Sequence, residues 1–310
     1  MKVSVIIPVY NAERFIRDAV ESALMQPETG EVILIEDNSP DASLAICQEL
    51  SNHHDRVRLL QHPDKGNHGA GASRNLGITS AQFPYICFLD ADDYMLPDRF
   101  KPAMKVFAET PDADGVYDAV GTHFMDEVSK EKWLRKRSEL LTTIHKRIPP
   151  EEVFYCQAVG RYGVFHTDGI VLRKDVFNKT GLFDTDLKLS QDTFMFIKIA
   201  AQCRLYPGSI DAPVAQRRIH RDNRVLRDSD VSRYKQLLWN KLFQWSSAAD
   251  IPQDYKAVIL STFILVNKQN GMSLPTIVSH HPNLLINKLF YFYLFSKIRS
   301  IFAAGDNINK

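Results

Sequence analysis

The sequence predicts an α/β fold in which helices flank a mostly parallel β-sheet, followed by a helical C-terminal extension. Short apolar runs rich in β-branched residues alternate four times with segments of helical periodicity in about the first hundred residues. From residue 231 onward the apolar spacing is helical. The 310 residues, 45% of them hydrophobic, suffice for two domains, which we place at 1–224 and 225–310.

The first part of the chain contains four expected strands, at residues 3–9, 31–35, 57–60 and 85–89. Asn11 and Asp41 are expected to cap the first two helices, and a glycine turn at 69–71 opens the third. Ligands of parallel sheets bind beyond the carboxyl ends of the strands, so the residues at these ends should line one crevice. These residues are Asn11, Asp37, His62 and Asp90.

Beyond residue 115 the pattern is less regular. We expect strands at 115–125 and 169–172 and a helix at 194–201. The charged stretch 130–147 is expected to be a helix or a mobile excursion from the domain.

The run Asp90-Ala91-Asp92-Asp93 directly follows the fourth strand. Three carboxylates in four residues repel one another unless a cation lies between them. Hard oxygen ligands suit Mg²⁺ or Mn²⁺, which commonly bridge to diphosphate oxygens. The alternative is a solvated acidic turn in which Asp93 caps a helix.

The glycine-containing segment NHGAGASRN at 67–75 is similar to a phosphate-binding turn at a helix N-terminus. It lacks GxxxxGK[ST], and Arg74 replaces the third glycine of GxGxxG. Kinase-like and ordinary dinucleotide sites are therefore disfavoured, but Arg74 can still reach an anion. The alternative is a plain loop with a surface arginine.

Three further polar residues have both a functional and a structural interpretation. Asp37 suits a nucleobase or a ribose hydroxyl, or else a helix-capping network with Ser39 and Asp41. Asp192 suits a general base, or else compensation of a helix dipole. His220 stands among four arginines, at 217, 218, 221 and 224, a cationic setting that suits a diphosphate.

In this order and spacing the motifs resemble glycosyltransferase family 2, whose members are inverting enzymes with a GT-A fold. The resemblance covers roughly residues 3–224 and depends on the combination of motifs. They are VSVIIPVYN at 3–11, DNS at 37–39, RNLG at 74–77, FLDADD at 88–93, GLFD at 181–184, QD at 191–192 and RIH at 218–220.

The resemblance implies a nucleotide-sugar donor, by default a UDP-sugar, and a saccharide or lipid-linked saccharide acceptor. Pro8, Tyr10 and Asp37 would hold the nucleobase and ribose. Arg74 and Asp90 would lie near the ribose and diphosphate.

The resemblance also implies a divalent cation, Mn²⁺ or Mg²⁺, with Asp92 as its main ligand and His220 as a further one. Asp192 would deprotonate the acceptor hydroxyl. The sequence departs from the family at Gln191, where Glu is usual, and at 221–224, where small residues are usual.

Two other functions compete with this interpretation. A nucleotidyltransferase should carry a glycine-rich, basic loop after the first strand, where this chain has Tyr10-Asn11-Ala12-Glu13. A catalytically silent nucleotide-sugar-binding module is compatible with Gln191, but the carboxylates of Asp92 and Asp192 favour an enzyme.

The composition and the N-terminal sequence limit the kinds of partner and the cellular compartment that we expect. The net charge of +1 argues against nucleic acid as a partner. Four cysteines without a CxxC pair suggest buried thiols in a reducing compartment. The N-terminus does not read as a signal peptide, and no apolar run reaches the ~18 residues of a spanning helix. We therefore expect a cytoplasmic protein.

The last part of the chain is basic, with 14 Lys and Arg against 6 Asp and no Glu from residue 217 onward. Residues 284–302 combine aromatic and basic side chains, which suits a helix at a membrane interface. The alternative is a helix docked on the protein or on a second subunit. The first interpretation places the enzyme at the inner face of the plasma membrane.

Overall fold

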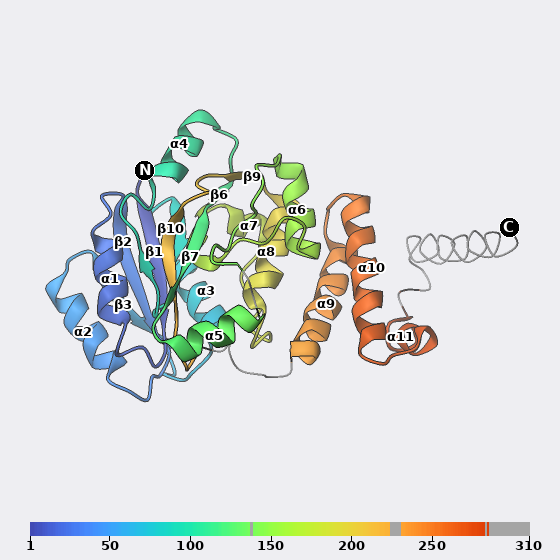
Figure 1. Cartoon of the computed structure of the whole chain (residues 1–310), viewed down its shortest axis with the longest axis horizontal. Coiled ribbons are helices and arrows are strands. Elements are labelled where there is room, and N and C mark those ends of the chain that lie inside the picture. The colour runs from blue at the N-terminus through green and yellow to red at the C-terminus, as the bar shows by residue number, and fades with distance from the viewer. Residues whose placement is uncertain (137–138, 224–230, 283, 285–310) are drawn as a thin grey trace, which may run out of the picture. The chain divides into compact units, whose positions relative to one another are not determined.

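The computed structural model describes residues 1–136, 139–223, 231–282 and 284. The chain divides into two compact units, 1–228 and 229–310 (Figure 1). The first unit contains a seven-stranded sheet with the order β3-β2-β1-β4-β8-β6-β9. Its strands are β1 (Val3–Val9), β2 (Thr29–Glu36), β3 (Val57–Gln61), β4 (Tyr85–Phe88), β6 (Gly115–Tyr117), β8 (Ile170–Arg173) and β9 (Leu205–Pro207).

The sheet is mostly parallel, as the sequence predicts. Strands β3, β2, β1 and β4 run parallel to one another, and β6 runs parallel to β9. Only β8 is antiparallel to both strands beside it, β4 and β6. The carboxyl ends of β1, β2 and β4 therefore meet at one edge, which is where the ligand crevice was expected.

Helices cover both faces of this sheet (Figure 1). Alternate residues of β1, among them Val5 and Ile7, belong to the core that includes the apolar side of α1 (Ile16–Leu24). Ile6 points to the opposite face, where α3 (Ala70–Ser80) packs so closely that a Cβ on Gly77 would lie 2.4 Å from an Ile6 methyl group. Glycine at position 77 thus lets α3 approach the sheet and fixes where its N-terminus lies.

The strand expected at 115–125 is wrong as one strand, because the chain forms two, in different sheets. Strand β6 ends at Tyr117, and β7 (Ala119–Phe124) belongs to a second sheet with β5 (Tyr94–Met95) and β10 (Pro213–Ile219). The break is at Asp118, which is fully buried and lies 3.0 Å from Nη1 of the equally buried Arg99. This ion pair lies at the point where the chain passes from one sheet to the other.

The remaining helices of the first unit are α2 (Ser43–His53), α4 (Lys101–Glu109), α5 (Glu127–Lys136), α6 (Pro150–Val159), α7 (Val176–Thr180) and α8 (Gln191–Gln202). The helix predicted at 194–201 is confirmed within α8. In the stretch 130–147, α5 is followed by isolated bridges from Thr142 to Val120 and from Ile144 to Gly163. Residues 137–138 of this stretch lie outside the described residues.

The second unit contains helices α9 (Val231–Ala248), α10 (Gln253–Gln269) and α11 (Leu274–His280). Asn267 of α10 is fully buried and donates to Asn240 of α9, while Gln236 donates to it, so a satisfied polar network joins the two helices. Of the segment 284–302, all but Leu284 lies outside the described residues. No helix in the described part of the chain is both long and apolar enough to span a bilayer.

Candidate active site

A cavity of about 640 Å³ lies at the carboxyl ends of β1, β2 and β4. All eight predicted site residues line it: Pro8, Tyr10, Asp37, Arg74, Asp90, Asp92, Asp192 and His220. The strand-end residues Asn11, Asp37 and Asp90 meet here as expected. His62 instead lies buried behind Asp37, with its Nε2 3.5 Å from the Asp37 carboxylate.

Asn11 does not cap the first helix, contrary to expectation. It adopts a left-handed conformation with φ of 53°, and α1 begins only at Ile16. The loop after β2 satisfies the backbone N–H groups of this turn: those of Asn11, Ala12 and Glu13 donate to Ser39 Oγ, Ser43 Oγ and Asp41 Oδ2. These bonds join the two loops, and Tyr10, 48% exposed, stands at the cavity wall between them.

Asp37 organises the loop that leads into α3. Its two carboxylate oxygens accept the backbone N–H groups of His68 and Gly69, each at 2.7 Å. The Asn67 side chain donates to the Asp37 carbonyl at 2.8 Å. Gly69 has a φ of 87°, which favours glycine at this turn. The expected helix-capping role with Ser39 is therefore replaced by a loop-holding role, and contact of Asp37 with a nucleobase or ribose stays a prediction.

Arg74 lines the cavity and has two unsatisfied side-chain donors. It is 4% exposed, and its Nη2 lies 2.7 Å from Asp90 Oδ1, while its guanidinium lies over the Phe183 ring. Its Nε and Nη1 are buried and make no hydrogen bond to any described residue. Since buried donors are normally paired, this arrangement suits an anionic ligand that accepts from Arg74. The interpretation as a surface arginine is wrong.

The three acids after β4 do not surround one point, so the idea that one cation holds all three apart is corrected. Asp90 turns toward Arg74, Asp92 toward His220, and Asp93 toward the interior. The Asp93 carboxyl accepts the backbone N–H of Arg218 at 2.7 Å. The interpretation of a solvated turn with Asp93 as a helix cap is also wrong, because Asp93 is buried and bonded to β10.

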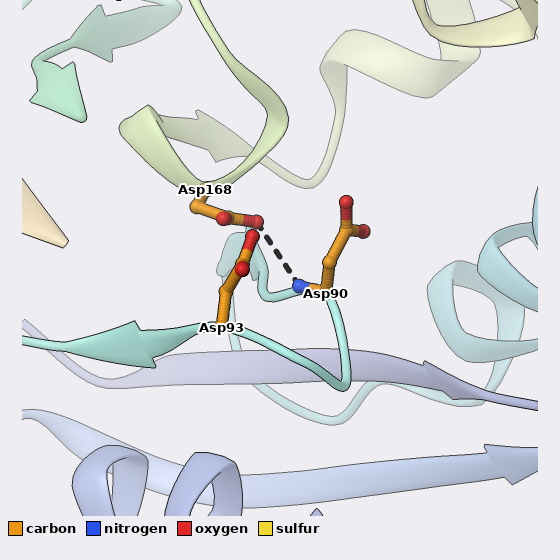
Figure 2. Close-up of side chains that lie close together, drawn as sticks. All are labelled: Asp90, Asp93 and Asp168. Carbon is orange, nitrogen blue, oxygen red and sulfur yellow. Dashed lines mark hydrogen bonds between the residues drawn. The ribbon is translucent and has the colours of Figure 1, made fainter. Parts of the chain in front are cut away.

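Asp93 faces a second buried carboxyl group, that of Asp168, as Figure 2 shows. Burial, followed by the charge of Asp168, raises the pKa of Asp93 well above its ordinary value. The pKa of Asp168 is lowered, because the charge of His166 and the hydrogen bonds of His166 and Asp93 outweigh its burial. These opposite pKa shifts favour the protonated form of Asp93 and the ionised form of Asp168.

Although oxygens of Asp90, Asp93 and Asp168 lie within 4.8 Å of one another, we do not assign this group as a metal site. Figure 2 shows the Asp90 side chain pointing away from the other two. The backbone N–H of Asp90 donates to Asp168 at 3.0 Å, and Arg99 donates to the Asp168 carbonyl at 2.7 Å. This cluster fixes the floor of the cavity. Sequence reasoning missed Asp168, His166 and Arg99, because Asp168 and Arg99 act through contacts with residues distant in sequence, and His166 acts through Asp168.

Asp92 and His220 form the pair that fits a divalent cation. Oδ2 of Asp92 lies 3.1 Å from Nε2 of His220 and accepts from the Asn223 amide, also at 3.1 Å. The Asp92 side chain is 31% exposed and lines the cavity. A carboxylate beside an imidazole, open to a cavity, supplies donors that Mn²⁺ accepts. Asn223, within the segment that departs from the family, thus adds a polar group to the expected pair.

Asp192 lies in the first turn of α8, after Ser190 with a φ of 64°. Its Oδ1 accepts the backbone N–H of Thr193 at 2.7 Å, and the side chain lines the cavity. Gln191 beside it packs close to Gly71 of α3 and also lines the cavity. The carboxylate of Asp192 is thus held by α8, on a different element from the Asp92–His220 pair.

This architecture is a GT-A fold. The chain is similar to the structure of Staphylococcus aureus TarS 1-349 in complex with UDP-GlcNAc, with a TM-score of 0.64 and 21% identity. The match covers 91% of this chain and 76% of that one. The structure of the mannosyltransferase PcManGT of Pyrobaculum calidifontis, in complex with GDP-Man and Mn²⁺, matches with a TM-score of 0.58 and 17% identity. This match covers 99% of this chain and 87% of that one.

The chain belongs to glycosyltransferase family 2, whose model, "Glycosyl transferase family 2", matches residues 4–179. The minor teichoic acid biosynthesis protein GgaB of Bacillus subtilis is 27% identical over 206 residues, which is 66% of this chain and 21% of that protein. The chain spans 54% or less of the length of the first curated relatives that it matches.

Proposed function

We propose that this protein transfers a sugar from a nucleoside-diphosphate sugar to an acceptor hydroxyl, with inversion of the anomeric centre. The observation that carries the proposal is the content of one cavity. It holds the Asp92–His220 pair, an arginine with unsatisfied donors, and the carboxylate of Asp192. Membership of glycosyltransferase family 2 supports the reaction class.

The donor nucleotide is proposed to lie along the loops after β1 and β2. Pro8 and Tyr10 line this part of the cavity, and Asp37 holds the adjoining loop in place. Arg74 would donate to the ribose or the diphosphate with the nitrogens that have no other described partner. TarS binds UDP-GlcNAc and PcManGT binds GDP-Man, which supports a nucleotide-sugar and leaves a UDP-sugar as our default choice.

A divalent cation, Mn²⁺ or Mg²⁺, would be held by Asp92 and His220. Bound there, it would stabilise the negative charge of the departing diphosphate. Asp90 is not needed as a ligand in this scheme, because its carboxylate pairs with Arg74. The presence of Mn²⁺ in the PcManGT complex supports this choice of ion.

Asp192 is proposed as the general base. As the acceptor oxygen bonds to the anomeric carbon, the bond between that carbon and the diphosphate oxygen breaks, and the acceptor proton passes to Asp192. The nucleoside diphosphate leaves with the electron pair. Attack from the side opposite the leaving group inverts the anomeric centre.

The acceptor is proposed to be a saccharide or lipid-linked saccharide in the synthesis of a polysaccharide or similar glycan. The relative GgaB, a minor teichoic acid biosynthesis protein, supports a cell-envelope setting. The aromatic and basic residues of 284–302 support peripheral contact at the inner face of the plasma membrane. Truncation before residue 284 should then abolish binding to anionic liposomes at low salt. Equal binding by the full and truncated chains would refute the membrane contact.

The function is tested by measuring the thermal unfolding of the protein in the presence of a panel of nucleotide-sugars, with and without Mn²⁺. A donor at 100 times its Kd should stabilise the fold by about 2.7 kcal/mol. Stabilisation by one nucleotide-sugar, dependent on Mn²⁺, is the expected result. A response to none of the panel would refute the proposal. Binding without release of nucleoside diphosphate in the presence of acceptor fractions would favour a silent binding module.

A further inference from the structure

The arginines around His220 differ in what they contact. Arg218 is buried, and its guanidinium binds the Asp92 carbonyl at 3.1 Å and Asp18 at 2.7 Å. The Arg221 side chain is 69% exposed and lies 3.5 Å from Asp126. Arg224 lies outside the described residues. Arg217 is the member of the described three that lines the cavity.

Arg217 is held from two sides. Its guanidinium lies 4.3 Å from the centre of the Trp133 ring, and its Nη2 donates to Thr142 Oγ1 at 3.3 Å. Trp133, 1% exposed, belongs to a small core with Ile219. Two backbone hydrogen bonds between Thr142 and Val120, at 2.8 and 3.1 Å, hold Thr142 in place as the second partner of Arg217. The side chain therefore approaches the cavity already ordered, which reduces the entropy lost when it binds a ligand.

The charges of the cavity show what Arg217 can bind. Six acidic side chains line it, from Asp37, Asp90, Asp92, Asp93, Asp192 and Asp222, of which Asp93 favours its protonated form. Its described lining includes two arginines, Arg74 and Arg217, and one nitrogen of Arg74 is bound to Asp90. A diphosphate entering such an acidic cavity needs cationic partners besides a metal ion. Arg217 lies in β10, three residues before His220, which directly follows that strand, and both side chains line the cavity together with Asp92.

We propose that Arg217 binds the diphosphate of the donor and that Trp133 is the positioning residue that presents it. The proposal rests on the proposed function, because it takes a nucleoside diphosphate as the ligand. A planar guanidinium stacked on an indole has a fixed orientation and a fork geometry that matches phosphate oxygens, which a lysine ammonium does not reproduce. The segment of α5 and Thr142 thereby becomes part of the donor site, although neither Trp133 nor Thr142 lines the cavity.

The experiment compares calorimetric affinities for UDP in the presence of Mn²⁺ with affinities for uridine, measured by NMR titration. Arg217→Gln should weaken UDP binding about tenfold or more, the scale of one lost charge-assisted hydrogen bond, and leave uridine binding unchanged. Arg217→Lys should recover only part of the loss. Arg221→Gln, which removes the same charge from an exposed neighbour, should bind both ligands as the wild type does.

Trp133→Phe keeps a ring in the small core and tests the positioning role. It should weaken UDP binding in the wild-type background and add little to Arg217→Gln, because both changes remove one interaction. The Arg217 assignment is overturned if Arg217→Gln binds UDP as the wild type does, or loses UDP and uridine equally. Additive losses in the double variant would overturn the role of Trp133 alone. If the wild type binds neither UDP nor any other nucleoside diphosphate, the proposed function itself fails.

Discussion

Nε2 of His220 lies 3.1 Å from Oδ2 of Asp92, although 128 positions separate the two residues in the chain. The contact joins the turn after β4 to the end of β10, two strands that belong to different sheets. The Asn223 amide donates to the same carboxylate oxygen. The second sheet thus completes a pair of potential metal ligands at the edge of the first.

Asp92→Asn tests this pair. The change removes the negative charge while keeping the shape, so Mn²⁺-dependent binding of a nucleoside diphosphate should fall at least about tenfold, or ~1.4 kcal/mol. Calorimetry in the presence of Mn²⁺ and of EDTA measures the effect. Asp211→Asn is the matched control, because it removes the same charge from a side chain that is 86% exposed and does not line the cavity. If Asp92→Asn kept the wild-type dependence on Mn²⁺, the metal assignment would be wrong.

Asp37→Asn tests the role of Asp37 in holding the loop before α3. The two oxygens of Asp37 each accept a backbone N–H, whereas asparagine offers one oxygen, so one partly buried N–H loses its acceptor. The free energy of unfolding should fall by about 1–3 kcal/mol, measured by urea denaturation. Asp64→Asn, at a side chain that is 64% exposed, should change it much less. Equal stability of Asp37→Asn and wild type would contradict the loop-holding role.

The sequence predicts the parallel strands and the site residues at their carboxyl ends well, for a physical reason. Apolar runs of β-branched residues specify the buried parallel strands locally, and topology then brings the strand ends together. All eight predicted site residues consequently line one cavity. The features that the sequence does not predict depend on contacts between residues that are distant in the chain. The break at Asp118 requires its buried ion pair with Arg99, and the cavity floor requires Asp168 beneath Asp93.

The conformation of Asn11 was missed for the same reason. A polar residue after a strand is a normal helix cap, but here the loop after β2 supplies the acceptors for this turn. Arg217 likewise carries no local signal that separates it from Arg218 or Arg221. Its stacking on Trp133 appears only once α5 lies against β10.

The four cysteines should be inert in the folded protein. All are buried, and burial is the largest cause that raises the pKa of Cys47 and Cys203 to about 12 and of Cys87 and Cys156 to about 11. The nucleophilic thiolate is therefore scarce at pH 8, and a disulfide reagent such as DTNB should react slowly. All four thiols should react rapidly in guanidinium chloride. Rapid modification of the native protein at pH 8 would contradict the burial.

Asp192→Asn tests whether Asp192 is the general base for sugar transfer from a donor bound in this cavity. The rate of nucleoside diphosphate release from the donor, in the presence of acceptor, is measured beside the calorimetric affinity for that donor. We expect near-wild-type donor affinity and transfer lowered by roughly 10²-fold or more, the scale of a lost general base. Asp186→Asn, which removes the same charge from an exposed neighbour, should leave both unchanged. Transfer by Asp192→Asn at the wild-type rate, or loss of its donor binding, would contradict the account.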